Sequence, residues 1–97
     1  MSFRQTEAQH QRRVILEVLQ EDSSYSHNEV ILKTALHSIG HNISSDTLNT
    51  QLNWLQEQQL VELDEVEGLT IVKLTQRGQD VATGATDVPG VMRGRLK

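Results

Sequence analysis

The side chains of this chain that could carry chemistry are its histidines and its carboxylates. His37 and His41 are four residues apart, a spacing that can place two imidazoles on one face of a helix. Gly40 lies between them and is expected to end the helix there. The chain has no cysteine, so the thiolate ligands that soft metals prefer are absent. The sequence therefore predicts surface histidines, no metal site and no cofactor.

Patterns typical of enzymes are missing from the sequence. It contains no Gly-rich loop for phosphates, no G-x-S-x-G turn and no Cys nucleophile. The carboxylates within residues 64–67 (DEVE) are most simply an exposed turn whose charges repel one another. A domain of 97 residues also offers little room for a substrate pocket. We therefore do not expect an enzyme.

Length and composition indicate one small protein domain. The 97 residues are enough for a single modest core. No apolar run approaches the roughly 20 residues that span a bilayer, and residues 1–13 are polar, unlike a signal peptide. A cytoplasmic protein is the simplest interpretation. The net charge of −4 gives no general electrostatic argument for binding nucleic acid.

Two helices are predicted in the first half of the chain from the spacing of apolar residues. The first is expected at about residues 5–20, with Arg12 and Arg13 mostly outside its apolar stripe. The second is expected to open with a capping box at residues 26–29 (SHNE) and to end at Gly40.

A third helix and a two-stranded ribbon are predicted in the second half. The helix is expected from Ser45 to about Gln59, capped by Ser44 or Ser45. Its leucines at positions 48, 52 and 55 recur at helical spacing and are expected to point inward. Residues 60–74 alternate as two strands around an acidic turn that ends in Gly, and a short fourth helix follows. The predicted fold class is mainly α with a small antiparallel β-hairpin.

Two segments resemble the winged helix-turn-helix superfamily, in particular regulators of the MarR, PadR and ArsR types. LNWLQEQQLVEL, residues 52–63, resembles the junction between the recognition helix and the first wing strand. VKLTQRGQDVATG, residues 72–84, resembles the stretch after the wing, where L-T-x-x-G begins the next helix. The whole chain, including VPGVMR at residues 88–93, is also similar to small ArsR-type proteins of Mu-like prophages.

The resemblance implies a winged helix-turn-helix domain over residues 1–84, followed by a flexible basic tail at residues 85–97. It also implies binding of double-stranded DNA, with the third helix in the major groove. Asn can pair with adenine through two hydrogen bonds, and Ser or Thr can bond phosphates or base edges. Carried onto this sequence, the groove-facing candidates are Ser44, Ser45, Thr47, Asn49, Thr50 and Asn53. The alternatives are helix capping for the two serines, and an ordinary solvated helix face for Asn49, Thr50 and Asn53.

The charges around the third helix depart from the pattern of DNA-binding proteins. DNA affinity rests largely on Lys and Arg, yet this helix has neither, and Asp46 and Glu57 bracket it. The acidic turn would repel a phosphate backbone. Phosphate contacts are therefore expected from the basic termini, and the carboxy-terminal tail could gain order on DNA. Its basic residues are Arg93, Arg95 and Lys97.

Two functional hypotheses remain from the sequence. One is a small transcriptional regulator that binds double-stranded DNA and is phage- or prophage-encoded. The other is a winged-helix module that binds another protein and not DNA. A homodimer paired through the terminal helices, as the resemblance implies, fits both. Its patch could come from apolar residues that could equally pack within the chain, namely Val14, Val18, Val88, Val91 and Met92.

Overall fold

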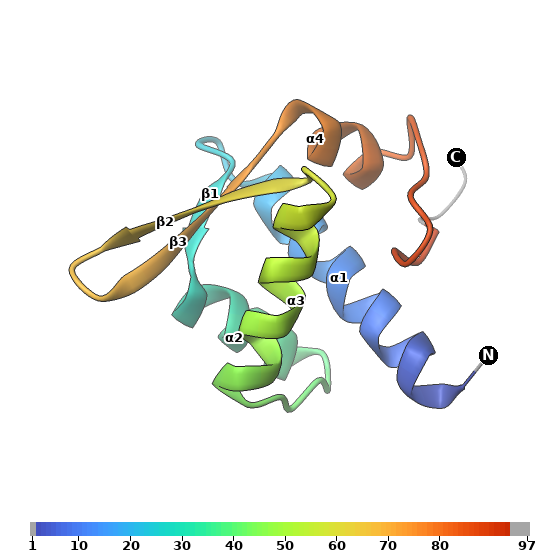
Figure 1. Ribbon diagram of the computed structural model, residues 1–97, viewed down its shortest axis with the longest axis horizontal. Helices are drawn as coiled ribbons and strands as arrows, with labels where there is room; N and C mark the ends of the chain where they lie inside the picture. The colour runs from blue at the N-terminus through green and yellow to red at the C-terminus, as the bar shows by residue number, and fades with distance from the viewer. Residues whose placement is uncertain (1, 94–97) are drawn as a thin grey trace.

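The computed structural model describes residues 2–93 as four helices and one three-stranded antiparallel sheet (Figure 1). The predicted hairpin is confirmed, and Figure 1 shows it projecting from the helices. Within these residues no helix is both long enough and apolar enough to cross a membrane. The elements in chain order are α1 (Phe3–Glu21), β1 (Ser26–Asn28), α2 (Glu29–Ser38), α3 (Ser45–Glu57), β2 (Val61–Val66), β3 (Leu69–Leu74) and α4 (Gln76–Ala82).

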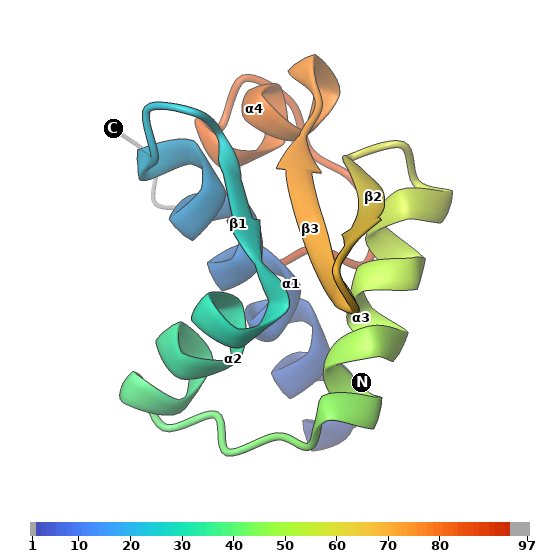
Figure 2. The ribbon, with the colours of Figure 1, turned by 90° about the vertical axis from the view of Figure 1, so that its left-hand side faces the viewer.

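The strand β1 shows that the capping box predicted at residues 26–29 is wrong. Ser26 lies in β1, which pairs antiparallel with β3, so that β3 is the central strand (Figure 2). Asn28 caps α2 instead, and its side-chain oxygen accepts the backbone N–H of Ile31 at 2.9 Å. Both residue types suit a cap, but β1 pairs with β3 as far as Asn28, so α2 begins at Glu29 and Asn28 is the residue next to its first turn. Gly40 follows the end of α2 with a φ of +96°, as predicted.

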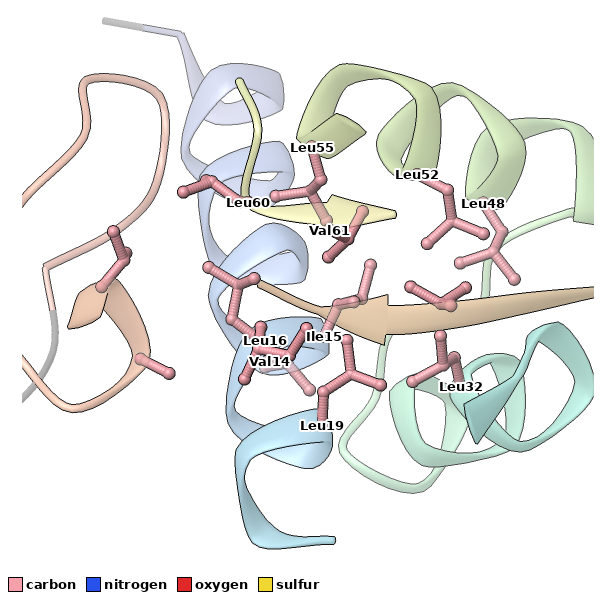
Figure 3. Close-up of a cluster of buried hydrophobic side chains, with 14 of the residues drawn as sticks. Val14, Ile15, Leu16, Leu19, Leu32, Leu48, Leu52, Leu55, Leu60 and Val61 are labelled. Atoms are coloured by element: carbon pink, nitrogen blue, oxygen red, sulfur yellow. The ribbon is translucent and has the colours of Figure 1, made fainter. Parts of the chain in front are cut away.

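The core lies where α1, α2 and α3 meet the inner face of the sheet, and Figure 3 shows side chains from these elements pointing toward one another. Leu48, Leu52 and Leu55 of α3 are buried there, as their spacing predicted. The helix ends two residues before the predicted Gln59, which takes a φ of +63°. The same buried cluster includes Ile15, Leu16, Leu19, Leu32, Leu36, Leu60, Val61 and Val72.

Arg13 is part of this interior, although the sequence predicted it outside the apolar stripe. It is only 7% exposed. Its Nη1 donates to the Val81 carbonyl oxygen at 2.7 Å and its Nη2 to that of Ala82 at 2.6 Å. The Nε donates to the Glu17 carboxylate at 3.1 Å. The last carbonyls of a helix have no hydrogen-bond donor within the helix. Arg13 supplies donors to two of them at the end of α4 and so joins α4 to α1.

The segment after α4 also differs from the prediction of a flexible tail from residue 85. Val88 is buried in the core cluster. The Met92 N–H donates to the Gln9 carbonyl of α1 at 3.1 Å. Arg12 Nη1 donates to the Gly90 carbonyl at 2.9 Å, and Gly90 lies against the Trp54 ring of α3. The described part of this segment is therefore packed across α1 and α3.

Candidate nucleic-acid interface

The connection between α2 and α3 begins the candidate interface. Ser44 is the N-cap of α3, and its Oγ accepts the Thr47 N–H at 3.0 Å and donates to Thr47 Oγ1 at 3.1 Å. Its one hydroxyl proton is therefore used inside the protein. Ser44 therefore acts as a helix cap, which was one of its two predicted roles. The Thr47 hydroxyl is exposed and keeps its own proton for donation.

The outer face of α3 carries the other predicted contacts. Asn49, Thr50 and Asn53 are exposed, opposite the three buried leucines. Thr50 Oγ1 donates to the Asp46 carbonyl oxygen at 3.2 Å, so this hydroxyl can only accept from a ligand. Among residues 2–93, no side chain or backbone group bonds to the amides of Asn49 and Asn53. Both amides are thus available to a partner outside the chain.

Lys33 adds a positive charge that the sequence analysis did not assign to this surface. Its Nζ donates to Ser45 Oγ at 3.1 Å, although the two residues are 12 apart in the sequence. Lys33 is the residue next to the buried Leu32. Its position beside a predicted core residue was the available signal that it lies at the edge of the packed face. It lies beside a hollow of about 290 Å³ whose lining also includes His37 and Asn42.

The predicted basic tail is only partly within the described residues. Arg93 is exposed and donates through Nε to the Asp87 carboxylate at 3.1 Å, so an acidic neighbour offsets its charge. Arg95 and Lys97 lie outside the described residues. Their role in phosphate contact therefore stays a prediction.

The hairpin turn is acidic and exposed, as predicted. Glu67 and Gly68 take φ values of +52° and +83° and form the two-residue turn between the paired Val66 and Leu69. Val66 is 50% exposed and Leu69 is 39% exposed. The tip therefore presents apolar side chains among the carboxylates of Asp64, Glu65 and Glu67.

Two backbone amides on the edge of the sheet along β2 are occupied by side chains. The Leu63 N–H donates to Gln56 Oε1 of α3 at 2.9 Å, and the Glu65 N–H donates to Asp64 Oδ1 at 2.9 Å. Alternate residues of an edge strand turn their amides away from the sheet, and these two amides are already occupied. A partner strand could not add to β2 without breaking these hydrogen bonds.

His37 and His41 have separate surroundings. His37 Nδ1 lies 3.0 Å from Asn42 Oδ1, whereas His41 Nε2 lies 2.7 Å from His10 Nδ1. In the part of the chain that the structure describes, no group of three or more His, Asp or Glu side chains could hold a metal ion.

The apolar residues considered for a dimer patch are mostly used within the chain. Val14 and Val88 are buried, and Val18 and Val91 pack against the same core. Met92 lines a cavity between the start of α1 and the end of α2. These residues therefore support packing within the chain, and the homodimer stays a prediction.

Comparison with known proteins relates the chain to a phage. It is 48% identical over 84 residues to protein gp26 of Escherichia phage Mu, with 87% of this chain and 86% of that protein aligned. The chain belongs to the family of Mu gp26. It is also 41% identical over 78 residues to a protein of Haemophilus influenzae (strain ATCC 51907 / DSM 11121 / KW20 / Rd), with 79% and 76% aligned. No protein-family model matches the chain. The relationship to Mu gp26 fits the predicted phage connection, and neither relative's name states a function.

Proposed function

We propose that this chain is a winged helix-turn-helix protein that binds double-stranded DNA and regulates transcription of phage genes. The observation that carries the proposal is the outer face of α3, where Asn49 and Asn53 are exposed and make no hydrogen bond with the chain's described residues. Asn amides can each form two hydrogen bonds to adenine in the major groove. The order of helices and strands supports the proposal, because α2, a short turn and α3 precede the β2–β3 hairpin.

The first phosphate contacts in this proposal come from the amino-terminal end of α3. Lys33 Nζ lies 3.1 Å from Ser45 Oγ at that end, where the helix dipole also favours an anion. The acidic hairpin tip works against the phosphate backbone, so α3 would have to approach the groove with the tip turned away. We therefore expect modest affinity that is greatest at low salt.

Replacing the two amides tests whether α3 reads sequence. We expect Asn49→Ala and Asn53→Ala each to reduce discrimination against the wrong base pair by about 1–3 kcal/mol, because a bidentate contact is lost. The measurement is a selection from random duplex DNA with the native chain, followed by titration of the selected and altered duplexes with each variant. Gln76→Ala, at an exposed position of α4, is the control. The groove assignment is wrong if both variants discriminate as well as the native chain.

Protein binding is the second candidate, and the hairpin tip favours it. Val66 and Leu69 are apolar, exposed and surrounded by carboxylates, which suits a partner surface that is both apolar and basic. Because two amides on the β2 edge are occupied, that contact would use side chains rather than an added strand. This candidate replaces DNA binding if the native chain binds no duplex at low salt.

A further inference from the structure

A line of polar side chains crosses the packed interface between α1 and α3. Arg12 Nε donates to Gln51 Oε1 at 2.7 Å, and Gln51 Nε2 donates to Gln11 Oε1 at 3.1 Å. Gln11 Nε2 lies 3.4 Å from His41 Nδ1, and His41 Nε2 lies 2.7 Å from His10 Nδ1. Both glutamines are buried. The line therefore connects α3 with the turn that precedes it, through α1.

The direction of donation along this line is set at one end. Arg12 can only donate, so the Gln51 oxygen must accept and its amide nitrogen donates to Gln11. The Gln11 nitrogen then donates to His41 Nδ1, which leaves the His41 proton on Nε2. That proton is donated to Nδ1 of His10. The complete line therefore requires both imidazoles to be neutral, with their protons on Nε2.

One added proton breaks the line whichever histidine receives it. A proton on His41 Nδ1 faces the Gln11 amide N–H. A proton on His10 Nδ1 faces the N–H at His41 Nε2. If His41 moves its own proton to Nδ1 instead, that N–H faces the Gln11 amide N–H. The line cannot reverse as a whole because Arg12 cannot accept.

The surroundings of His41 also disfavour its charged form. Burial holds the pKa of His41 below its ordinary value of 6.5, and His10 lowers this pKa further while Glu7 raises it. Glu7 and His10 face it from α1, the neutral Ile39 and Gly40 follow α2, and Met92 comes from the carboxy-terminal segment. From α3 the line contributes Gln51, which carries no charge. A cavity of about 440 Å³ opens on this histidine pair and gives water access to it.

We propose that His10 and His41 form a proton-sensitive latch, which holds the turn before α3 against α1 when both rings are neutral and releases it when one is protonated. The latch itself does not depend on DNA. Its effect on DNA binding rests on the proposed function, because α3 is the helix that would be repositioned.

Trp54 offers a direct readout at the other end of the line. It is the only tryptophan in the chain. The Arg12 guanidinium lies 4.0 Å from the centroid of its ring, in a cation–π contact. The added proton breaks the line at the histidines. Because Gln51 is bonded both to Gln11 and to Arg12, a shift of the glutamines on release moves the guanidinium and changes the surroundings of the indole.

The test follows Trp54 fluorescence and urea unfolding of the full chain between about pH 8 and pH 5, where histidine titrates. Because the pKa of His41 is lowered in the folded state, the unfolded chain binds the proton first as the pH falls. The latch therefore makes its full contribution to the free energy of unfolding above pH 6.5, and this contribution falls as the pH drops below 6.5. We expect a fluorescence step centred below 6.5. The variant His10→Asn with His41→Gln should remove the step, and His37→Gln should keep it. A flat profile for the native chain, or a step that persists in the double variant, overturns the proposal.

A second measurement needs no variant. NMR of the imidazole nitrogens at about pH 8 should show both His10 and His41 protonated on Nε2 and not on Nδ1. The opposite assignment for either ring overturns the latch. Duplex DNA titrations at the same pH values separate the two proposals. If the chain binds no DNA but shows the fluorescence step, the proposed function fails and the latch stands. If it binds DNA without the step, the latch fails.

Discussion

Replacing Arg13 by methionine is expected to lower the free energy of unfolding by about 2–4 kcal/mol, because hydrogen bonds from a charged donor are worth about 1.5–3 kcal/mol each and do not add fully. The guanidinium donates to the carbonyl oxygens of Val81 and Ala82 at the end of α4. Methionine fills a similar space but removes both guanidinium donors, and within residues 2–93 only the Val81 carbonyl keeps another one, the Gly84 N–H at 3.2 Å. Urea unfolding followed by circular dichroism measures the change.

A buried charge can sometimes be replaced by an apolar residue at no cost, but this requires that its partners are replaced as well. Apart from Glu17, the partners of Arg13 are backbone carbonyls, which no side-chain substitution removes. Arg4→Met is the matched control, because Arg4 is exposed on the same helix. We expect it to change stability by less than about 0.5 kcal/mol. Equal stability of the two variants would contradict the role given to Arg13.

Gly78→Ala is expected to destabilise the protein by about 2–3 kcal/mol, mainly through overpacking. Alanine favours a helix over glycine by about 1 kcal/mol, so helix propensity alone predicts the opposite sign. In α4, however, a Cβ at position 78 would lie 2.6 Å from Leu74 Cδ1 and would overlap the backbone carbonyl of Leu60. The close approach of α4 to Leu60 and Leu74 is the structural reason for a glycine at this position of the L-T-x-x-G pattern.

The thermal unfolding midpoint of Gly78→Ala, compared with that of Gln76→Ala, tests this account. Both changes introduce alanine into α4, but residue 76 is exposed and residue 78 is buried. We expect only the Gly78 variant to unfold at a clearly lower temperature. An unchanged or higher midpoint would show that α4 can move away from Leu60 at little cost.

Local patterns in the sequence were sufficient for features whose partners are close in the chain. The spacing of Leu48, Leu52 and Leu55 predicted the buried face of α3, and the alternation of residues 60–74 predicted the hairpin. These patterns repeat within one element. They also predicted that Asn49 and Asn53 are exposed, since both lie opposite the leucines.

Features that depend on distant partners could not be predicted in this way. Arg13 contacts a carbonyl 68 residues further along the chain, and nothing near Arg13 distinguishes it from a surface arginine. Ser26 became a strand residue because β3 pairs with it. His10 and His41 are 31 residues apart, and only the packing of α1 against the turn before α3 brings them together. Each of these contacts is created by tertiary structure.

The candidate interface also combines features that local patterns predict with contacts that only tertiary structure creates. Ser44 was predicted either as a cap or as a DNA contact, and its hydrogen bonds to Thr47 show that it serves as the cap. Lys33 was not assigned to this surface because its contact with Ser45 crosses the turn between two helices. The structure therefore adds a positive charge next to α3 that its own sequence lacks.

Titration of random-sequence duplex DNA with the full chain, over about 50 to 200 mM salt, tests the central claim most directly. Each phosphate neutralised by a basic side chain adds about 0.9 to the slope of log affinity against log salt. We predict binding at the lowest salt, a steep loss of affinity as salt rises, and a slope smaller by about one for Lys33→Ala. An absence of binding at the lowest salt, or affinity independent of salt, would contradict the assignment of α3 as a DNA-binding helix.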